Sequence, residues 1–178
     1  RTAKLWCAAT GECLRTLEGH EGIVLSAAFS PGGREVVTSS SDETARLWCA
    51  ASGGCSRTLS AGCDAEIQSA TFSPCGRKVL TACLDGEAKL WCAASGECLL
   101  TLGDHEGPVY SAAFSADGLQ LLTGAADGTA KVWCASSGEC LRTLVGHRET
   151  VLSVAFSPDG CEILTASVDC TAKLWCAA

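Results

Sequence analysis

The sequence predicts an all-β protein in which small antiparallel sheets repeat along the chain. Three observations lead to this fold class: evenly spaced tryptophans, turn sequences at fixed distances, and short apolar segments between the turns. The tryptophans stand at positions 6, 48, 91, 133 and 175, so neighbours are 42 or 43 residues apart. A period of this size is typical of repeat folds in which each unit is one small sheet.

Each period contains four strands, as residues 151–176 illustrate. This segment, VLSVAFSPDGCEILTASVDCTAKLWC, reads as an apolar strand, a Pro-Asp-Gly turn, a second strand, a tight turn at Asp169 and a third strand ending in tryptophan. In the preceding period, GECLRTL at 138–144 supplies the fourth, outermost strand. Such a sheet is apolar on both faces, so neighbouring sheets must cover it.

The same pattern divides the chain into five successive units of one repeat segment. The first contains only a third and a fourth strand, TAKLWC at 2–7 and ECLRTL at 12–17. Three complete four-stranded units follow, beginning near Ile23, Glu66 and Pro108, and the last unit has three strands. The expected units are residues 1–17, 18–59, 60–102, 103–144 and 145–178.

Composition argues against two classes of partner, nucleic acids and membranes, and indicates a cellular location. The formal net charge is −7, and lysine and arginine do not cluster, which argues against binding to a nucleic-acid backbone. No run of 18 apolar residues and no apolar leader is present, so we expect no membrane association and a cytoplasmic location, or a nuclear one. The sequence also lacks methionine, so we expect it to be a piece of a longer protein.

Three polar positions keep a constant distance from the tryptophans. An aspartate lies six residues before four of them, and a threonine lies four residues before each of these aspartates. A histidine lies 28 residues before three of the tryptophans, whereas Cys63 occupies that position in the second complete unit.

At these residues the sequence resembles the WD-repeat β-propeller family over its whole length. The Gly-His pairs at 19–20 and 146–147, the FSPDG turn at 156–160 and the TAKLW strand at 171–175 match the family's motif. The resemblance implies a WD-like propeller segment of about four blades. In a blade of this family, His, Thr or Ser, Asp and Trp form a hydrogen-bonded tetrad.

Carried over to this sequence, the resemblance implies three complete tetrads and one incomplete tetrad. Because cysteine cannot replace the imidazole, we expect the blade with Cys63 to be weaker by about 1–3 kcal/mol if Asp85 is buried without a partner. The implied residues are His20, Thr38, Asp42 and Trp48; Thr81, Asp85 and Trp91; His105, Thr123, Asp127 and Trp133; and His147, Thr165, Asp169 and Trp175.

Whether the segment closes into a ring follows from the strand count. Residues 12–17 can supply the outer strand that the last unit lacks and so close four blades, but residues 2–7 would then be surplus. Members of the family usually have about seven blades, so four would bend too sharply. We therefore expect an open or incomplete ring whose terminal blades expose apolar faces and favour self-association.

Asp, His and a hydroxyl also make up a nucleophilic triad, but a structural role explains them better here. A catalytic constellation is built once, at an accessible place, whereas this set recurs in phase with the core. The sequence contains no phosphate-binding GxxxxGK loop and no histidine pair at helical spacing. We expect no catalysis and no cofactor.

Cysteine replaces the aspartate that the family has after each tryptophan. A second cysteine follows six residues later in four units, so the two flank one hairpin. Three interpretations are open: small buried thiols, hairpin disulfides, or two-thiolate metal contacts. We favour free thiols, as is usual in an intracellular protein. The paired positions are Cys7 and Cys13, Cys49 and Cys55, Cys92 and Cys98, and Cys134 and Cys140, with Cys176 alone.

One loop face of the segment is acidic and is the expected partner-binding face. Its loops carry seven acidic residues against one arginine, which favours a protein or peptide partner that is basic. We expect a non-catalytic interaction scaffold. The alternatives are a docking segment of a larger signalling protein or enzyme, and a thiol-based redox or metal-handling array. The expected contact residues are Glu21, Ile23, Asp64, Glu66, Leu84, Glu106, Pro108, Arg148 and Val168.

Overall fold

The computed structural model describes residues 1–60 and 65–177, and over these residues it contains seventeen β-strands in five antiparallel sheets. Within the same residues no helix has the length and apolar character needed to cross a membrane. The strands are β1 (Thr2–Trp6) and β2 (Cys13–Glu18); β3 (Val24–Phe29), β4 (Glu35–Ser40), β5 (Thr44–Cys49) and β6 (Cys55–Ser60); β7 (Ile67–Phe72), β8 (Lys78–Cys83), β9 (Ala88–Cys92) and β10 (Cys98–Leu102); β11 (Val109–Phe114), β12 (Gln120–Ala125), β13 (Thr129–Cys134) and β14 (Cys140–Val145); and β15 (Val151–Phe156), β16 (Glu162–Ser167) and β17 (Ala172–Cys176).

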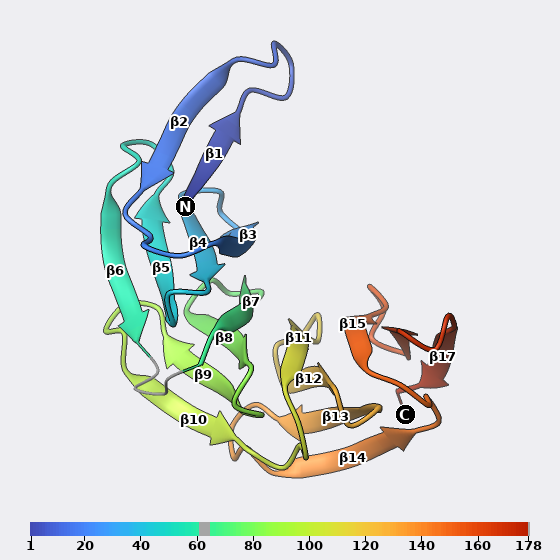
Figure 1. The fold of residues 1–178 in the computed structure, drawn as a ribbon. Coiled ribbons are helices and arrows are strands. Elements are labelled where there is room, and N and C mark those ends of the chain that lie inside the picture. The colour runs from blue at the N-terminus through green and yellow to red at the C-terminus, as the bar shows by residue number, and fades with distance from the viewer. Residues whose placement is uncertain (61–64, 178) are drawn as a thin grey trace.

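The five sheets follow one another along an open arc (Figure 1). The two-stranded sheet β1–β2 lies at one end and the three-stranded sheet β15–β17 at the other, with three four-stranded sheets between them. The long outermost strands β6, β10 and β14 run along the outer rim, and β3, β7, β11 and β15 line the inner side. The predicted all-β fold class and the open ring are confirmed.

Strand register repeats from sheet to sheet. The first and second strands shift register between Val24 and Ser26, and the same shift recurs in the next three sheets. A second shift falls just before the tryptophan of the third strand, where it meets the outermost strand, for example between Val132 and Trp133. A β-bulge adds twist, so the repeated bulges give every sheet the same twisted shape.

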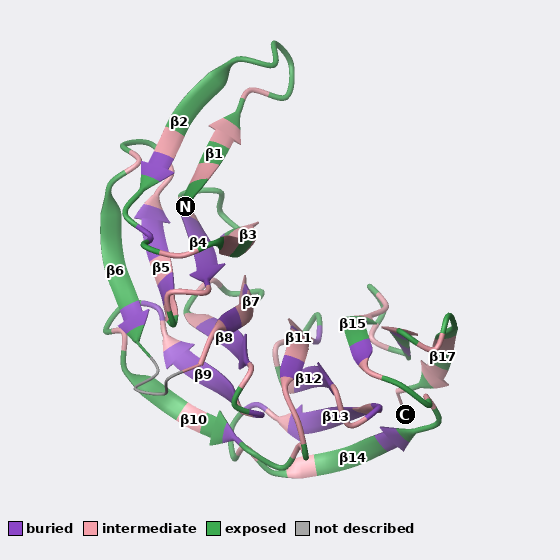
Figure 2. Cartoon of the chain, viewed as in Figure 1, coloured by how far each residue is buried: buried purple, intermediate pink, exposed green. Residues whose placement is uncertain are grey.

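The core lies between neighbouring sheets, because each sheet has two apolar faces. Leu121 and Leu122 are consecutive residues of β12 with no exposed surface, and their side chains point to opposite faces. Leu121 packs against Leu80 and Leu90 of the preceding sheet, and Leu122 packs against Ile163 of the following sheet. The middle sheets are therefore covered on both sides (Figure 2).

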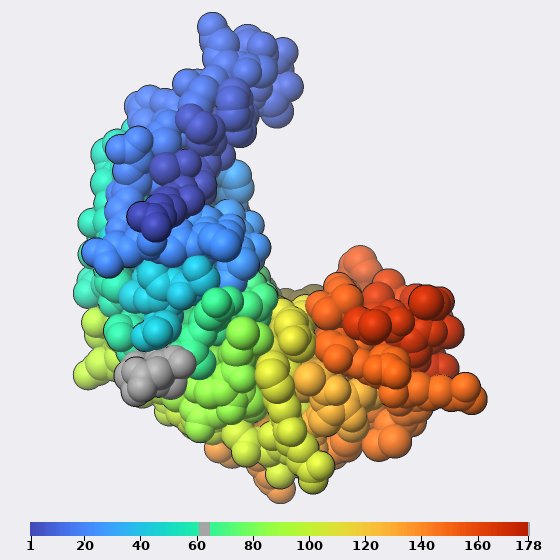
Figure 3. All heavy atoms as spheres, in the orientation of Figure 1, coloured from blue at the N-terminus to red at the C-terminus, as the bar shows by residue number. Residues whose placement is uncertain are grey.

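The two ends of the arc are uncovered (Figure 3). Leu164 is 48% exposed, whereas Leu122, its counterpart one repeat earlier, is 0% exposed. At the other end Phe29 is 60% exposed, whereas its counterpart Phe72 is 7% exposed. Residues that form the core in the middle of the arc thus form apolar surface at its ends.

We predict that the 178-residue chain, produced by itself, associates through these end faces, because buried apolar area is gained when two such faces meet. Size-exclusion chromatography with light scattering measures the association. Replacing Leu164 and Leu174 with lysine should shift the population toward monomer. A stable monomer of the unmodified chain at all concentrations would contradict the prediction.

Candidate functional site

A chain of hydrogen bonds joins the loop before β3 to the interior of the β3–β6 sheet. His20 lies in that loop, Thr38 on β4, Asp42 in the β4–β5 turn and Trp48 on β5. His20 Nδ1 lies 2.8 Å from Asp42 Oδ2, and His20 Nε2 lies 2.7 Å from Thr38 Oγ1. Trp48 Nε1 donates to the same Thr38 hydroxyl at 2.8 Å.

The chemistry of the two end groups determines the direction of the outer bonds. Indole N–H can only donate and an ionised carboxylate can only accept. Trp48 therefore donates to Thr38, and Nδ1–H of His20 donates to Asp42. With the imidazole proton on Nδ1, the Thr38 hydroxyl donates to Nε2 and all four side chains are satisfied.

The same network recurs in the β11–β14 and β15–β17 sheets. In the first, the bonds from His105 to Thr123 and Asp127 are 2.7 and 2.9 Å, and Trp133 donates to Thr123 at 2.8 Å. In the second, His147 lies 2.7 Å from Thr165 and 2.8 Å from Asp169, and Trp175 donates to Thr165 at 2.9 Å. The three imidazoles also contact the tryptophan rings edge to face.

A second threonine completes each network, and sequence analysis missed it. Thr44 lies two residues after Asp42, and its hydroxyl donates to Asp42 Oδ1 at 2.6 Å. Thr129 and Thr171 do the same for the other two aspartates, at 2.7 and 2.6 Å. These threonines keep the tryptophan phase, so the spacing could have identified them.

The β7–β10 sheet retains only part of the network. Trp91 donates to the buried Thr81 at 2.9 Å, and the Thr81 hydroxyl donates to the Lys89 carbonyl at 3.4 Å. Asp85 is exposed and accepts the Glu87 amide proton, so its carboxylate is neither buried nor without a partner. The condition for the expected 1–3 kcal/mol weakening is therefore not met at Asp85. Cys63 lies outside the described residues.

Hydrogen bonds and burial shift the pKa values of the network in opposite directions. Burial raises the pKa of Asp42, but hydrogen bonds from Thr44, His20 and the Glu21 amide outweigh it and hold this pKa well below the ordinary value. The balance at Asp127 also lowers its pKa. Burial lowers the pKa of His105, although Asp127 partly opposes this. The His105–Asp127 pair therefore holds a neutral imidazole beside a carboxylate.

The hydroxyls of the network lie in the core rather than in a cleft. Thr38, Thr123 and Thr165 are 0% exposed, and each hydroxyl is occupied by both a tryptophan and a histidine. No substrate can reach a hydroxyl in this position. The geometry is that of a structural tie between a loop and a sheet.

The tetrads anchor the loops that form one end of the sheets, which we call the loop face. It consists of the loops that connect one sheet to the next and the turns between second and third strands. The amides of Glu21, Glu106 and Arg148 donate to the tetrad aspartates at 2.9, 3.1 and 3.1 Å. The structure places eight of the nine expected contact residues on this face, and Asp64 lies outside the described residues.

Backbone hydrogen bonds connect loop and turn within each blade. The amides of Ser41, Leu84, Ala126 and Val168 donate to carbonyls of the loop before the first strand of the same sheet at 2.8–3.0 Å, including those of Ile23, Glu66 and Pro108. Ile23 and Val168 are more than half exposed. Over the described residues, each loop is therefore joined to the turn of its own blade.

Glu43 is an acidic residue of the loop face that sequence analysis missed. It occupies the tip of the β4–β5 turn with φ 66°, is exposed, and corresponds to Gly86 and Gly128 in the next two sheets. A non-glycine residue is uncommon in this left-handed region. The repeated glycines were the signal that this position is a turn tip.

The paired cysteines do not lie opposite each other. In all four hairpins the second cysteine pairs with the tryptophan rather than with the first cysteine, as Cys140 does with Trp133. The two cysteines of a pair are not cross-strand neighbours, because the register shift at the tryptophan displaces the pairing by one residue. Within residues 1–60 and 65–177, no three His, Cys, Asp or Glu side chains are arranged to hold a metal ion.

The first cysteine of each pair accepts hydrogen bonds from the hairpin turn that it begins. At Cys134, hydrogen bonds from the hydroxyls of Ser136 and Ser137 and from their amides lower the thiol pKa to about 6. The Ser136 hydroxyl lies 3.2 Å from the sulfur. In this position the thiol caps the turn, as a carboxylate could.

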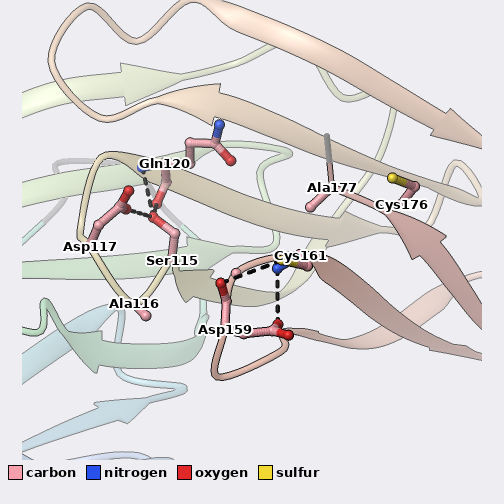
Figure 4. Close-up of a pocket in the computed structure, with 9 residues that line it drawn as sticks. Ser115, Ala116, Asp117, Gln120, Asp159, Cys161, Cys176 and Ala177 are labelled. Carbon is pink, nitrogen blue, oxygen red and sulfur yellow. Dashed lines mark hydrogen bonds between the residues drawn. The ribbon is translucent and has the colours of Figure 1, made fainter.

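Cavities lie between sheets at the end opposite the loop face. One of about 380 Å³ separates the β11–β12 turn from the β15–β16 turn, and Figure 4 shows its lining. Asp117 and Asp159 cap these two turns and accept hydrogen bonds from Ser115 and Ser157. Cys161 and Cys176 line the same cavity.

Comparison with known proteins identifies the repeats. The family model for the WD domain, G-beta repeat, matches residues 11–49, 53–92, 96–134 and 138–176. The chain is 48% identical over 44 residues to nuclear distribution protein nudF 2 of Aspergillus clavatus and to nuclear distribution protein PAC1-2 of Uncinocarpus reesii. These alignments span 25% of this chain but only 10% and 9% of those relatives.

We predict that Thr123→Val destabilises the chain more than Thr81→Val. The first change leaves both Trp133 and His105 without their partner, whereas the second removes the Trp91 bond and a longer bond to a carbonyl. The difference should be about 1 kcal/mol in the free energy of unfolding, measured by urea denaturation. Equal losses of unfolding free energy in the two variants would contradict the prediction that the bond between Thr123 and His105 adds to stability.

We predict that acid destabilises the chain. The pKa of His105 is lowered from 6.5 in the folded state, so the unfolded chain binds a proton first as the pH falls through this value. Asp127 has the same effect as the pH falls below its ordinary pKa of 3.8. The urea concentration at which half of the chain is unfolded should be lower at about pH 5 than at about pH 7.

His105→Gln should reduce the dependence of the midpoint on pH in this range, because glutamine does not titrate. A midpoint that stays constant or rises on acidification would contradict the assignment of a neutral His105.

Proposed function

Because this chain belongs to the WD40 repeat family, we propose that it is a non-catalytic scaffold that binds a protein or peptide on its loop face. The partner is basic, and it binds along the loops that the tetrads anchor. The single observation that carries the proposal is the combination of a rigid loop backbone with exposed acidic side chains at the same positions.

Charge on the loop face supports a basic partner. Glu21, Glu43 and Glu106 are exposed, and the exposed Glu149 follows the only arginine of these loops, Arg148. Opposite charge on a partner raises the association rate and suppresses partners of the same charge. Because the Glu21 and Glu106 amides are bound to the tetrad aspartates, the backbone that carries these two side chains is held in place.

Apolar groups on the same face supply the contact area that charge alone does not. Ile23 and Val168 are 66% and 52% exposed, and Leu84 and Pro108 are partly exposed beside the turns. Affinity in such interfaces comes mainly from a few well-packed side chains, and the charged rim determines rate and specificity.

The experiment compares charge reversal on the two ends of the sheets. A lysine- and arginine-rich peptide selected for binding to the chain should bind about tenfold more weakly to a Glu21→Lys, Glu106→Lys variant, which corresponds to about 1.4 kcal/mol. Added salt should weaken binding to the unmodified chain. Isothermal titration calorimetry measures both effects.

Glu97→Lys, Glu139→Lys is the matched control, because it makes the same change in net charge at the opposite end of the sheets. The proposal is overturned if both double variants weaken binding equally, since the effect would then come from net charge alone. It is also overturned if acidic and basic peptides bind equally well.

A further inference from the structure

A second cavity at the end opposite the loop face combines a thiol with two arginines. It lies between the β3–β6 and β7–β10 sheets, has a volume of about 490 Å³, and is lined by Cys92, Arg57, Arg77 and Glu35. Arg57 comes from β6 of one sheet, Arg77 from the β7–β8 turn of the next, and Cys92 from the end of β9. Two cations and one carboxylate leave the lining positive.

The sulfur of Cys92 is prepared as a nucleophile by the turn that follows it. Ser95, through its side chain and its amide, and the Ala94 amide lower the pKa of Cys92, although burial and Glu97 oppose this. The Ser95 hydroxyl itself donates to Glu97 Oε2 at 3.0 Å. Backbone bonds from Cys92 to Gly96 and Glu97 close the turn. The side chain is partly exposed, so a reagent in the cavity can reach it.

The side chain of Arg57 and the backbone of Arg77 are held beside this turn. Arg57 Nη1 donates to the Ser95 carbonyl at 3.4 Å, and the Arg77 carbonyl accepts the Ala93 amide at 2.9 Å. Guanidinium groups bind carboxylates in a planar, two-point geometry. A small molecule with a carboxylate near its reactive sulfur would therefore be held with that sulfur close to Cys92.

We propose that this cavity captures small disulfides that carry carboxylates, with Cys92 as the nucleophile and Arg57 and Arg77 as the carboxylate-binding groups. The Cys92 thiol loses its proton to solvent, and the thiolate attacks one sulfur of the disulfide. A new S–S bond forms to Cys92 while the original S–S bond breaks, and the other half leaves as a thiolate with the bonding electrons. Cys92 is oxidised and the departing half is reduced.

The next repeat provides a natural comparison within the same chain. Cys134 occupies the position of Cys92 and has a thiol pKa of about 6. Leu100 and Leu119 stand at the positions of Arg57 and Arg77. Cys134 is therefore an activated thiol without these two guanidinium groups. Lys78 stands at the position of Glu35 and lines the cavity next to Cys134, so the two sites differ in guanidinium groups rather than in net charge.

The test measures how each cysteine discriminates between iodoacetate and iodoacetamide, which differ in charge but undergo the same displacement of iodide. Taking the ratio of the two rates at one cysteine cancels its thiolate fraction. Brief labelling followed by peptide mass spectrometry should give an iodoacetate-to-iodoacetamide ratio at Cys92 about tenfold higher in the folded chain than in denaturant. Glutathione disulfide should form a mixed disulfide at Cys92 faster than cystamine does.

Variants test the role of the arginines. Arg57→Leu, Arg77→Leu removes both guanidinium groups and should reduce the ratio at Cys92 to its value in denaturant or below, whereas Arg34→Leu, a change in the corresponding turn of another sheet, should leave it unchanged. Labelling of the denatured chain gives the iodoacetate-to-iodoacetamide ratio at Cys92 in the absence of folded structure. A ratio at Cys92 that is no higher in the folded chain than in denaturant, or one that the double variant does not change, would overturn the proposal.

Discussion

The structure depends on one physical constraint: each sheet is apolar on both faces and can remain in water only between two neighbours. Leu121 and Leu122 show the constraint at its simplest, because adjacent residues on β12 are buried against different sheets. The core is thus a series of contacts between successive sheets, as in other repeat proteins. Each added sheet covers the face that the previous one exposes, and the last sheet leaves a face of its own uncovered.

The tetrads connect this packing to the surface. A loop of exposed polar residues would ordinarily be mobile, but here the backbone next to each histidine is bound to an aspartate whose own position depends on a buried threonine and tryptophan. The loops lose their conformational entropy when the sheet folds. Binding of a partner therefore does not have to order them again. The β7–β10 sheet shows that the tryptophan–threonine bond persists where Asp85 is exposed.

Repetition preserves geometry while single substitutions change local chemistry. The turn cysteines occupy one geometric position in every hairpin, yet their surroundings differ, with two arginines beside Cys92 and two leucines at the same positions beside Cys134. The cavities at this end also differ in charge, since Asp117 and Asp159 line the one between the last two sheets. A repeat fold can therefore present several distinct sites on one scaffold, each made where two sheets meet.

The sequence by itself determined the repeat unit and the strand order within it, because the tryptophans, turns and apolar segments recur at a constant period. It also determined which His, Thr and Asp positions recur with each tryptophan, whereas their assignment to tetrads was implied by the family resemblance. Only the tertiary structure decided the rest. A register shift of one residue placed Cys140 opposite Trp133, which spacing along the chain does not reveal. The exposure of Asp85 and the meeting of Arg57, Arg77 and Cys92 depend on how one sheet lies against the next, and no pattern within a single repeat encodes that.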